Sequence, residues 1–590
     1  MTDYRAPVKD MLFVLRELAG LEAVGQLPGY EEATDDLVEA VLEEAAGFAA
    51  GVVAPINSVG DSQGTRVEND RVVVPEEFAD AYRQFAENGW AGLAQSPDFG
   101  GQGLPYLVGL AVEEMWQSAS LAWSLCPLLT QGAARAVELH ADDALKAMVL
   151  EKMVTGAWTG TMNLTEPQAG SDLSAVRTVA APDGDAFRIT GQKIYITWGD
   201  HDMTDNVMHL VLARLPDAPA GTRGISLFAV PKRLINPDGS LGDANSVRPV
   251  SVEHKLGIHG SPTCVMAYEN ALGYLVGAPN HGLACMFTMM NHARIGVGLE
   301  GVAISERAYQ QALAYARDRV QGPVVGRDGP APIVHHPDVR RMLMTIKATT
   351  EAMRALALVT GAHLDHAHRN PEKGARAAHD ARVQLLTPVV KGWCTETSQV
   401  LTSLAIQVHG GMGYVEETGV AQHYRDARIT TIYEGTTGIQ ANDLIGRKTL
   451  RDEGRAFRAL LDDMRETEGR LAGQADLQTV RSALAEGIDS LSAAVDWVLE
   501  HAGKDPVAAG AVANNLLMLT GVVAGGWQMA RAAEAAVAAL ANNTVDPDFH
   551  RAKLATAEFY AQQVMPQAGA YAKALSSGAG AVLGVPEELL

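Results

Sequence analysis

FRITGQKIYIT (187–197) is the first of three short runs rich in β-branched and aromatic residues, and NVMHLVLARL (206–215) and GISLFAVPK (224–232) follow it. Turn-forming segments border them, PDGD (182–185) before the first and LPDAPAG (215–221) before the third. Short runs of this composition between turn signals predict β-strands. We therefore expect a compact β domain over residues 158–280.

On both sides of these strands, the sequence pattern predicts helices. Apolar residues recur at helical spacing in 34–54 and again in 335–368. One apolar stripe marks the C-terminal region: Leu477, Val480, Leu484, Ile488, Leu491, Val495 and Leu499. The prediction is a mostly α fold with an inserted β domain. Its four parts are an N-terminal helical domain (1–157), the central β domain (158–280), a helical bundle (281–450) and an additional C-terminal helical domain (451–590).

Composition narrows the class of protein. Of the 590 residues, 47% are hydrophobic and 20% are charged, which is typical of a globular chain and unlike a disordered one. The formal charge of −23 repels phosphate polymers, so we expect no nucleic-acid partner. The four cysteines are far apart and form no CxxC pair, which argues against a disulfide framework and favours a reducing cytoplasm. The N-terminal residues show no secretory pattern.

Residues 506–530 carry no charged side chain and are long enough to span a bilayer. Asn514 and Asn515 lie in the middle of this segment, and Gly525 and Gly526 interrupt its far end. Amide side chains are costly in lipid, so we favour a helix buried among other helices. Membrane association remains the alternative interpretation.

The first segment that could carry chemistry is MNLTEPQAGSDLSAVRT (162–178). Thr165, Gly170 and Ser171 place a hydroxyl and freely oriented backbone amides in one loop, which suits an anion or a heteroaromatic edge. An ordinary loop in which Asp172 caps a short turn is the competing interpretation.

The second segment is ARITTIYEGTTGIQ (427–440). Thr437 and Gln440 form a capping-box pattern that predicts a helix start. Glu434 lies just upstream, beside Gly435, so its carboxylate could serve as a general base. Alternatively, it is an acid that satisfies the dipole of a helix N-terminus.

Two further sequence patterns could suggest a nucleotide or metal site. QVHGGMGYVEETG (407–419) does not match GxGxxG and lacks a βαβ context, which argues against a Rossmann site. GDHD (199–202) with His209 matches no recognised ligand spacing, so we expect no metal.

In order along the chain, several segments resemble the acyl-CoA dehydrogenase family over residues 30–450. They are FGGQGLP (99–105), TEPQAGSD (165–172), GQKIYIT (191–197), EHKLGIHGS (253–261), Arg319 to Gly322, QVHGG (407–411) and IYEGTTGIQ (432–440). The residues 4–15, 199–232 and the extra C-terminal region look like a longer subgroup that includes 3-methylmercaptopropionyl-CoA dehydrogenases.

The resemblance implies an FAD enzyme whose site residues match positions of this sequence. Those expected at the flavin are Met162, Asn163, Leu164, Thr165, Ser171, Tyr195, Ile196, Thr197, Arg319, Gln321, Gln407, Gly410, Gly411, Thr436 and Gly438. Of these, Arg319, Gln321 and residues 407–411 match positions that reach the flavin of a neighbouring subunit. Tyr195 stands where the family usually has Trp, and the usual aromatic before Gly322 is missing. Ser171, Asn291 and Arg294 are expected near the substrate.

Glu434 falls on the family's catalytic base, and the helix that carries the base in other branches has Ala293 here. The resemblance implies α,β-dehydrogenation of an acyl-CoA, of either 3-methylmercaptopropionyl-CoA or a short-to-medium chain, with electron-transfer flavoprotein as acceptor. It also implies a homo-oligomer, which we expect to be a dimer. The alternatives are an acyl-CoA oxidase that uses oxygen and a non-catalytic binding protein of the same fold.

Overall fold

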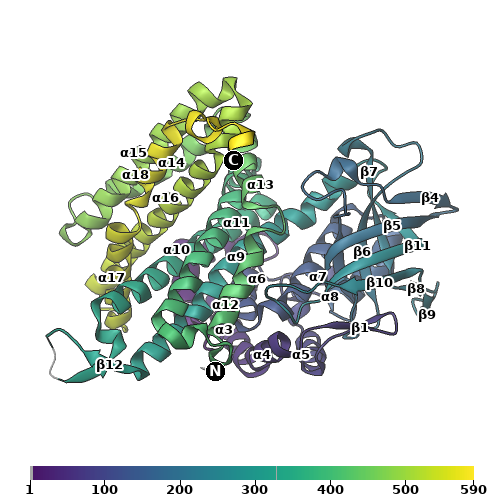
Figure 1. The fold of residues 1–590 in the computed structure, drawn as a ribbon, viewed down its shortest axis with the longest axis horizontal. Coiled ribbons are helices and arrows are strands. Elements are labelled where there is room, and N and C mark those ends of the chain that lie inside the picture. Colours follow the sequence, from purple (N-terminus) through teal and green to yellow (C-terminus); the bar gives the residue numbers. More distant parts are fainter. Residues whose placement is uncertain (1–3, 327–328) are drawn as a thin grey trace. The chain divides into compact units, whose positions relative to one another are not determined.

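The computed structural model describes residues 4–326 and 329–590 (Figure 1). Its contacts divide the chain into two units. Unit 1 comprises the described residues up to Ala46 together with Pro105–Glu114 and Arg294–Leu590, and unit 2 comprises Gly47–Leu104 and Met115–Ala293. The predicted class, mostly helical with an inserted β domain, is confirmed. The four domain boundaries expected from the sequence stay predictions.

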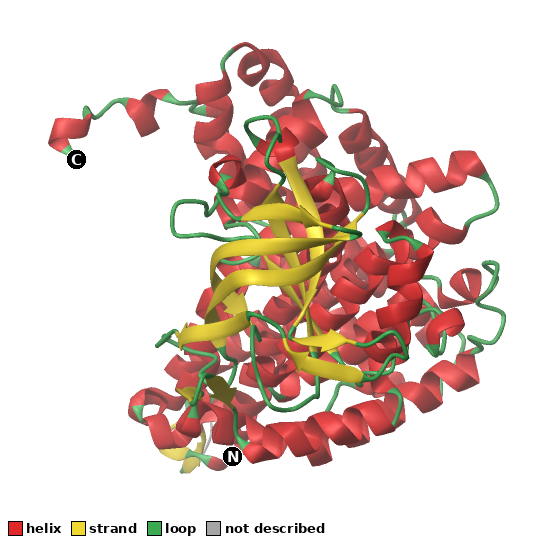
Figure 2. Cartoon of the chain, turned by 90° about the vertical axis from the view of Figure 1, so that its right-hand side faces the viewer, coloured by secondary structure: helices red, strands yellow, loops and turns green. Residues whose placement is uncertain are grey.

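Unit 2 contains the sheet that the three sequence runs predict (Figure 2). The runs form β5 (Ala186–Thr197), β6 (Val207–Arg214) and β7 (Ile225–Pro231). The other strands of this seven-stranded sheet are β3 (Thr159–Asn163), β4 (Val179–Asp183), β10 (Val247–Val252) and β11 (Thr263–Val276). The strand order is β10-β11-β5-β4-β6-β3, and β7 pairs with both β11 and β6.

The core of unit 2 forms where helices cover this sheet. Leu210 on β6 and Leu227 on β7 are fully buried in one cluster with Val149 and Val137 from two helices. The helices of this unit are α4 (Ala54–Gln63), α5 (Glu76–Glu87), α7 (Leu121–His140) and α8 (Asp143–Val154). A boundary between the two units falls within each of three helices: α3 (Asp35–Phe48), α6 (Tyr106–Ala119) and α9 (Gly282–Asp318).

Short hairpins lie outside the seven-stranded sheet, both within the predicted β domain and in regions that the sequence predicts as helical. In unit 2, β1 (Arg66–Glu68) pairs with β2 (Arg71–Val73), and β8 (Arg233–Ile235) pairs with β9 (Leu241–Ala244). In unit 1, β12 (Val320–Pro323) pairs with β13 (Pro330–Pro332). Strands of three or four residues are too short to show an alternating pattern.

Unit 1 is helical apart from that hairpin. Its central pair is α10 (Pro337–Arg369) and α11 (Lys373–His409), and α10 begins at the proline that follows His335 and His336. The remaining helices are α1 (Val8–Phe13), α2 (Leu21–Gly25), α12 (Val420–Ala427), α13 (Thr437–Asn442), α14 (Arg455–Arg470), α15 (Gln478–His501), α16 (Pro506–Ala541), α17 (Pro547–Gln563), α18 (Gln567–Ser576) and α19 (Gly580–Leu583).

Helix α16 contains the uncharged segment 506–530. It packs against α10, α11, α15, α17 and α18. Within the described part of the chain, it is the one helix long and apolar enough to cross a membrane, and 61% of its most apolar window is buried. This packing explains why the segment lacks charged residues, because other helices enclose it.

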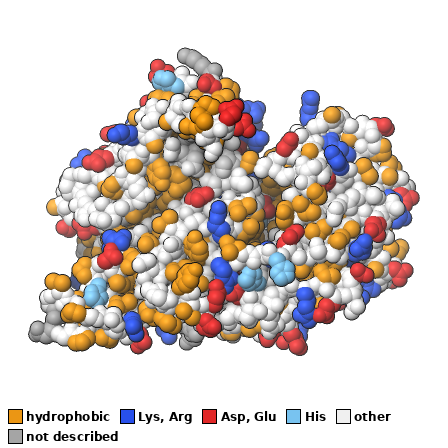
Figure 3. All heavy atoms as spheres, in the orientation of Figure 1, with side chains coloured by type: hydrophobic (Ala, Val, Ile, Leu, Met, Phe, Trp, Pro, Cys, Tyr) orange, Lys and Arg blue, Asp and Glu red, His pale blue; other side chains and the backbone are white. Residues whose placement is uncertain are grey.

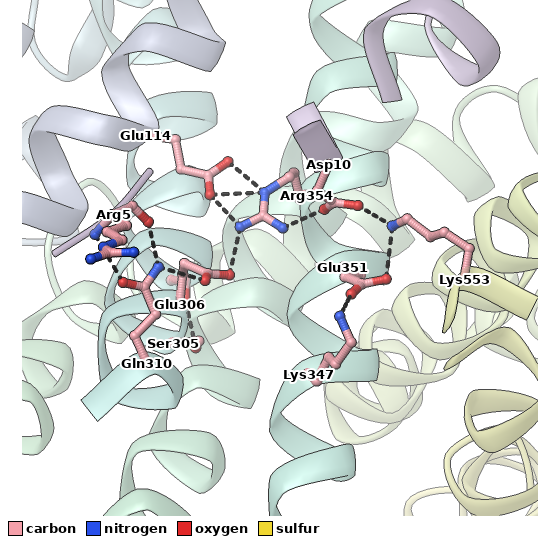
Figure 4. A network of polar contacts seen from close by, with 11 residues as sticks. Arg5, Asp10, Glu114, Ser305, Glu306, Gln310, Lys347, Glu351, Arg354 and Lys553 are labelled. Carbon is pink, nitrogen blue, oxygen red and sulfur yellow. Dashed lines mark hydrogen bonds and ion pairs between the residues drawn. The ribbon is translucent and has the colours of Figure 1, made fainter. Parts of the chain in front are cut away.

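A buried ion network ties the C-terminal helices to the bundle (Figure 4). Arg354 on α10 contacts Glu114 at 2.6 Å, Asp10 at 2.6 Å and Glu306 at 2.8 Å. Lys553 on α17 also pairs with Asp10, and it contacts Glu351 at 2.7 Å. Buried charges are tolerated when they are paired, so this network fixes α1, α6, α9, α10 and α17 against one another.

Charged side chains of both signs are interspersed with hydrophobic ones over the face drawn in Figure 3. Such mixing is typical of a surface in contact with water.

Candidate active site

Glu434 lies on a short turn in unit 1, between the 3₁₀ turn Arg428–Thr431 and helix α13. Its backbone is in the left-handed region with φ of +55°, and Gly435 follows with φ of +89°. A left-handed conformation costs a residue that has a Cβ about 1 kcal/mol or more, so the surrounding structure must hold it. The turn is a strained element of a kind that is common at active sites.

Two buried side chains hold this turn. Lys391 Nζ on α11 donates a hydrogen bond to the carbonyl oxygen of Gly435 at 2.8 Å. Gln440 Nε2 on α13 donates to the carbonyl oxygens of both Glu434 and Gly435, each at 3.2 Å. Sequence reasoning missed both residues in this role. The one signal for Lys391 was a single cation within the apolar run TPVVKGWC (387–394).

The electrostatic surroundings of Glu434 suit proton transfer. Burial raises the pKa of its carboxyl to about 7, although the nearby charges of Arg294 and Lys391 lower it. A base with a pKa close to the working pH combines a useful ionised fraction with a strong drive to take a proton. The helix-dipole interpretation accounts for the position of Glu434 but not for this raised proton affinity.

Tyr433, the residue before Glu434, is fixed by a second acid. Its hydroxyl donates a hydrogen bond to Oε2 of Glu300, a fully buried residue on α9. Burial raises the pKa of Glu300 to about 8. Glu300 and Tyr433 are further members of the site that the sequence did not single out.

The helix after the turn begins one residue earlier than the capping-box pattern implies. Thr436 is the N-cap of α13, and its Oγ1 accepts a hydrogen bond from the N–H of Ile439 at 3.3 Å. The expectation that Thr437 fills this role is wrong, because its hydroxyl instead donates to Glu396 Oε1 at 2.5 Å. Gly438 lies in the first turn of α13 and is exposed.

Asn291 and Arg294 lie one turn apart on α9. Asn291 is exposed, whereas Arg294 is 7% exposed. Arg294 Nη1 lies 4.0 Å from Asp443 Oδ2, and within the described part of the chain its Nε has no hydrogen-bond partner. The structure therefore brings a buried guanidinium into the electrostatic environment of Glu434.

In unit 2, two predicted cofactor segments lie side by side. Met162 and Asn163 end β3, and the backbone of Leu164 and Thr165 continues beside β5. Ile194 N–H donates to Thr165 O at 2.9 Å, and Lys193 Nζ donates to Leu164 O at 3.0 Å. Tyr268 OH donates to Asn163 Oδ1 at 2.8 Å, which orients that buried amide.

Tyr195 is presented by an irregularity in the sheet. The register of β5 and β11 shifts between Cys264 and Met266, and Tyr195 has φ of +59°. Bulges re-aim side chains, and Tyr195 is 61% exposed here, whereas Ile196 is buried and Thr197 is half-buried.

Ser171 lies in an exposed loop of unit 2. The next residue, Asp172, caps the 3₁₀ turn Leu173–Ala175, and its carboxylate accepts a hydrogen bond from Ser174 N–H at 2.9 Å. The capping interpretation of this loop is correct. It leaves the hydroxyl of Ser171 available to a ligand.

The remaining predicted residues lie on exposed parts of unit 1. Arg319 Nη2 donates to Gln321 Oε1 at 3.3 Å, and both residues are exposed at the hairpin β12–β13. Gln407, Gly410 and Gly411 are exposed at the end of α11, where Gly410 has φ of +59°. Tyr414, three residues beyond Gly411, is 91% exposed.

The histidines of the GDHD segment belong to the core. His201 Nε2 lies 2.8 Å from Thr159 Oγ1, and His209 Nδ1 lies 2.8 Å from Thr161 Oγ1. Burial lowers the pKa of each to about 3, which keeps both rings neutral. Each ring therefore has a threonine partner on β3.

Four domain models match the chain. The N-terminal, middle and C-terminal domain models of acyl-CoA dehydrogenase match residues 35–157, 161–271 and 280–449. A model described as acetyl-CoA dehydrogenase C-terminal like matches residues 460–586.

Two relatives are similar over nearly their whole length. A 3-methylmercaptopropionyl-CoA dehydrogenase of Ruegeria pomeroyi is 51% identical and aligns with 96% of this chain and 97% of its own. A broad-specificity linear acyl-CoA dehydrogenase of Mycobacterium tuberculosis is 36% identical over 96% of each chain. Among solved structures, an acyl-CoA dehydrogenase of Bacillus anthracis complexed with FAD superposes with a TM-score of 0.74 at 20% identity. This match covers 95% of this chain and 91% of that one.

Proposed function

This chain belongs to the acyl-CoA dehydrogenase family, and we propose that it catalyses the FAD-dependent α,β-dehydrogenation of an acyl-CoA thioester to the trans-2-enoyl-CoA. The substrate that we propose first is 3-methylmercaptopropionyl-CoA, since the Ruegeria pomeroyi relative that carries this name is 51% identical. Short-to-medium straight acyl chains are the alternative substrates.

The observation that carries the proposal is the state of Glu434. The α-proton of a thioester is weakly acidic, so its removal needs a base of raised proton affinity held at one position. Burial raises the pKa of Glu434 to about 7, and Lys391 and Gln440 fix the backbone on which it lies. We assign Glu434 as the residue that removes the α-proton.

The residues of unit 2 fit a flavin. The exposed ring of Tyr195 offers a flat stacking surface, and Met162, Leu164 and Thr165 are half-exposed beside β5. Thr197 and Ser171 add hydroxyl groups. FAD supplies the acceptor for the β-hydride when it is bound. We propose that Thr436 and Gly438 contact the same group.

The exposed residues of unit 1 fit the other end of the cofactor. Together they offer a cation, two amides and accessible backbone, which suits a pyrophosphate or an adenosine. These residues are Arg319, Gln321, Gln407, Gly410 and Gly411. We propose that they serve the flavin of a second subunit, so the working enzyme is a homodimer. Asn291 and Arg294 are assigned to the substrate side.

Electron-transfer flavoprotein is the partner that we expect to reoxidise the enzyme, and the cytoplasm is the expected location. The absence of a CxxC pair and the wide spacing of the four cysteines agree with a reducing compartment.

The experiment is an anaerobic flavin spectrum with Glu434→Gln. The wild-type flavin band should bleach with 3-methylmercaptopropionyl-CoA, faster than with butyryl- or octanoyl-CoA. Glu434→Gln should bind FAD and the thioester yet reduce the flavin about 10²–10⁴-fold more slowly, as loss of a general base predicts. Glu417→Gln, on an exposed turn, is the control and should match the wild type. Near-normal reduction by Glu434→Gln would overturn the assignment of the base. In a separate assay with oxygen present, peroxide release without any other electron acceptor would identify an oxidase.

A further inference from the structure

Lys391 is a cation enclosed in the helical core of unit 1. The residue is 0% exposed in the middle of α11, within an apolar stretch that includes Val389, Val390 and Trp393. Burying an ammonium is expensive unless it is paired and hydrogen-bonded. The ammonium needs acceptors, and the contact in the structure is the hydrogen bond to the carbonyl oxygen of Gly435.

This contact falls on the peptide that follows the candidate base. Glu434 and Gly435 both have positive φ, and strained backbone persists only where its surroundings over-determine it. Gln440 on α13 donates hydrogen bonds to the carbonyl oxygens of both Glu434 and Gly435. Lys391 donates to the carbonyl oxygen of Gly435 from α11. The turn is therefore held from two helices, of which one supplies a charge.

We propose that Lys391 is the positioning residue of Glu434: its ammonium clamps the Glu434–Gly435 turn through Gly435 O and stabilises the ionised form of the Glu434 carboxylate. This inference rests on the proposed function in that it assigns Glu434 as the base. Lys391 acts through Glu434, because its hydrogen bond is to the carbonyl oxygen of the next residue.

Several other charged groups lie near the pair. On α9 these are Arg294, which lies 4.0 Å from Asp443, and Glu300, which accepts the Tyr433 hydroxyl. On α11, Glu396 accepts the Thr437 hydroxyl. Lys391 is the cation whose hydrogen bond reaches the turn itself.

The charge states at neutral pH support the proposal. Burial lowers the pKa of Lys391 to about 8, while Glu434 and Glu300 raise it, so the ammonium persists at pH 7. Burial raises the pKa of Glu434, and Arg294 and Lys391 oppose that rise. Removal of the Lys391 charge should therefore increase the proton affinity of Glu434.

The test compares three substitutions in the FAD-bound enzyme. Lys391→Gln removes the charge and keeps a donor, Lys391→Met removes both, and Lys391→Arg keeps the charge. Lys448→Met is the matched control, because Lys448 lies in the same unit but contacts Gln384 instead of the turn. The readout is the titration of the Glu434 carboxyl, followed by isotope-edited infrared difference spectra with Glu434→Gln as the reference. The pH profile of flavin reduction is measured beside it.

The midpoint of the Glu434 titration should rise by about one pH unit or more in Lys391→Gln and Lys391→Met, as expected for loss of a nearby opposite charge. The ascending limb of the pH profile should move by the same amount, and Lys391→Arg should restore both. An unchanged titration in a folded Lys391→Gln or Lys391→Met variant would overturn the proposal. So would the failure of all three Lys391 variants to fold, since the role would then be structural alone.

The infrared titration needs no turnover. If Glu434 proves not to be the base, flavin reduction survives in Glu434→Gln while the titration still reports whether Lys391 controls the carboxyl. Failure of the proposed function and failure of this inference are therefore distinguishable.

Discussion

The hydroxyl of Tyr433 donates a hydrogen bond to the buried carboxyl of Glu300, 133 residues earlier in the chain. This contact fixes the residue before Glu434, as the Lys391 contact fixes the residue after it. The candidate base is thus held on both sides by buried ionisable groups on α9 and α11. The first predictions test this arrangement.

Removal of the Tyr433 hydroxyl should weaken the fold and disturb the base. In Tyr433→Phe, the Glu300 carboxyl loses the hydrogen bond, and such a loss costs about 1 kcal/mol of stability. Urea denaturation measures that cost, and the rate of flavin reduction should fall because the turn is less constrained. Tyr424→Phe, at a 40% exposed position on α12, should change neither quantity. Equal behaviour of the two variants would contradict a role for this contact.

Glu300 should make stability depend on pH in a definite direction. Burial raises the pKa of its carboxyl from 4.5 to about 8, so the folded state binds a proton that the unfolded state releases. The resulting stabilisation is complete below pH 4.5 and is lost as the pH rises through about 8. Glu300→Gln keeps a neutral group at every pH.

The melting temperature of Glu300→Gln relative to the wild type should therefore increase between pH 6 and pH 9. The underlying change is at most about 1.4 kcal/mol for each pH unit. Glu466→Gln, on the exposed face of α14, is the control and should give a difference that does not vary with pH. A flat difference for Glu300→Gln as well would mean that Glu300 is ionised in the folded protein.

Lys553 should be essential to the attachment of the C-terminal helices. Its ammonium pairs with Asp10 and Glu351, and its side chain is 4% exposed. Lys553→Met leaves these buried carboxylates short of a cation, which costs about 3–5 kcal/mol. Lys9→Met removes an ion pair with Asp546 in which the Lys9 side chain is 65% exposed, and it should cost at most about 1 kcal/mol. Chemical denaturation compares the two variants.

The pH dependence of the stability lost in Lys553→Met tests whether the loss is electrostatic. Burial would raise the pKa of Asp10, but Lys553 and Arg354 lower it below the usual 3.8. The stability that Asp10 contributes is therefore present above pH 3.8 and is lost as the pH falls through its folded-state pKa. The gap between wild type and Lys553→Met should narrow on acidification. A gap independent of pH would point to lost packing instead.

The sequence was sufficient for elements with a clear local pattern. The runs that became β5, β6 and β7 are rich in β-branched and aromatic residues and lie between turn signals. The stripe that begins at Leu477, just before α15, is buried along that helix to Val495, with Leu499 half-buried near its end. The position of Glu434 just before a helix start was also predictable, although the cap proved to be Thr436. These features depend on residues close together in the chain.

Lys391, Glu300 and Gln440 could not be found as site residues in the same way. Lys391 meets Gly435 across 44 residues, and Glu300 meets Tyr433 across 133 residues. The neighbouring residues in the sequence do not distinguish Lys391 from a lysine whose aliphatic chain lies along a helix surface. Only the packing of α9, α11 and the Glu434 turn shows which buried ionisable groups share one environment.

Helix α16 carries glycines in two different environments. A Cβ at Gly521 would lie 2.1 Å from Trp393 Cγ on α11, whereas a Cβ at Gly510 would meet no atom within 4 Å. Gly521→Ala should therefore destabilise the protein by about 1–3 kcal/mol through overpacking. Gly510→Ala, in the same helix, should stabilise it by up to about 1 kcal/mol, because alanine favours the helix. Chemical denaturation should give opposite signs for the two variants. If both stabilise, α16 does not pack closely on Trp393, and the membrane interpretation of its uncharged segment regains support.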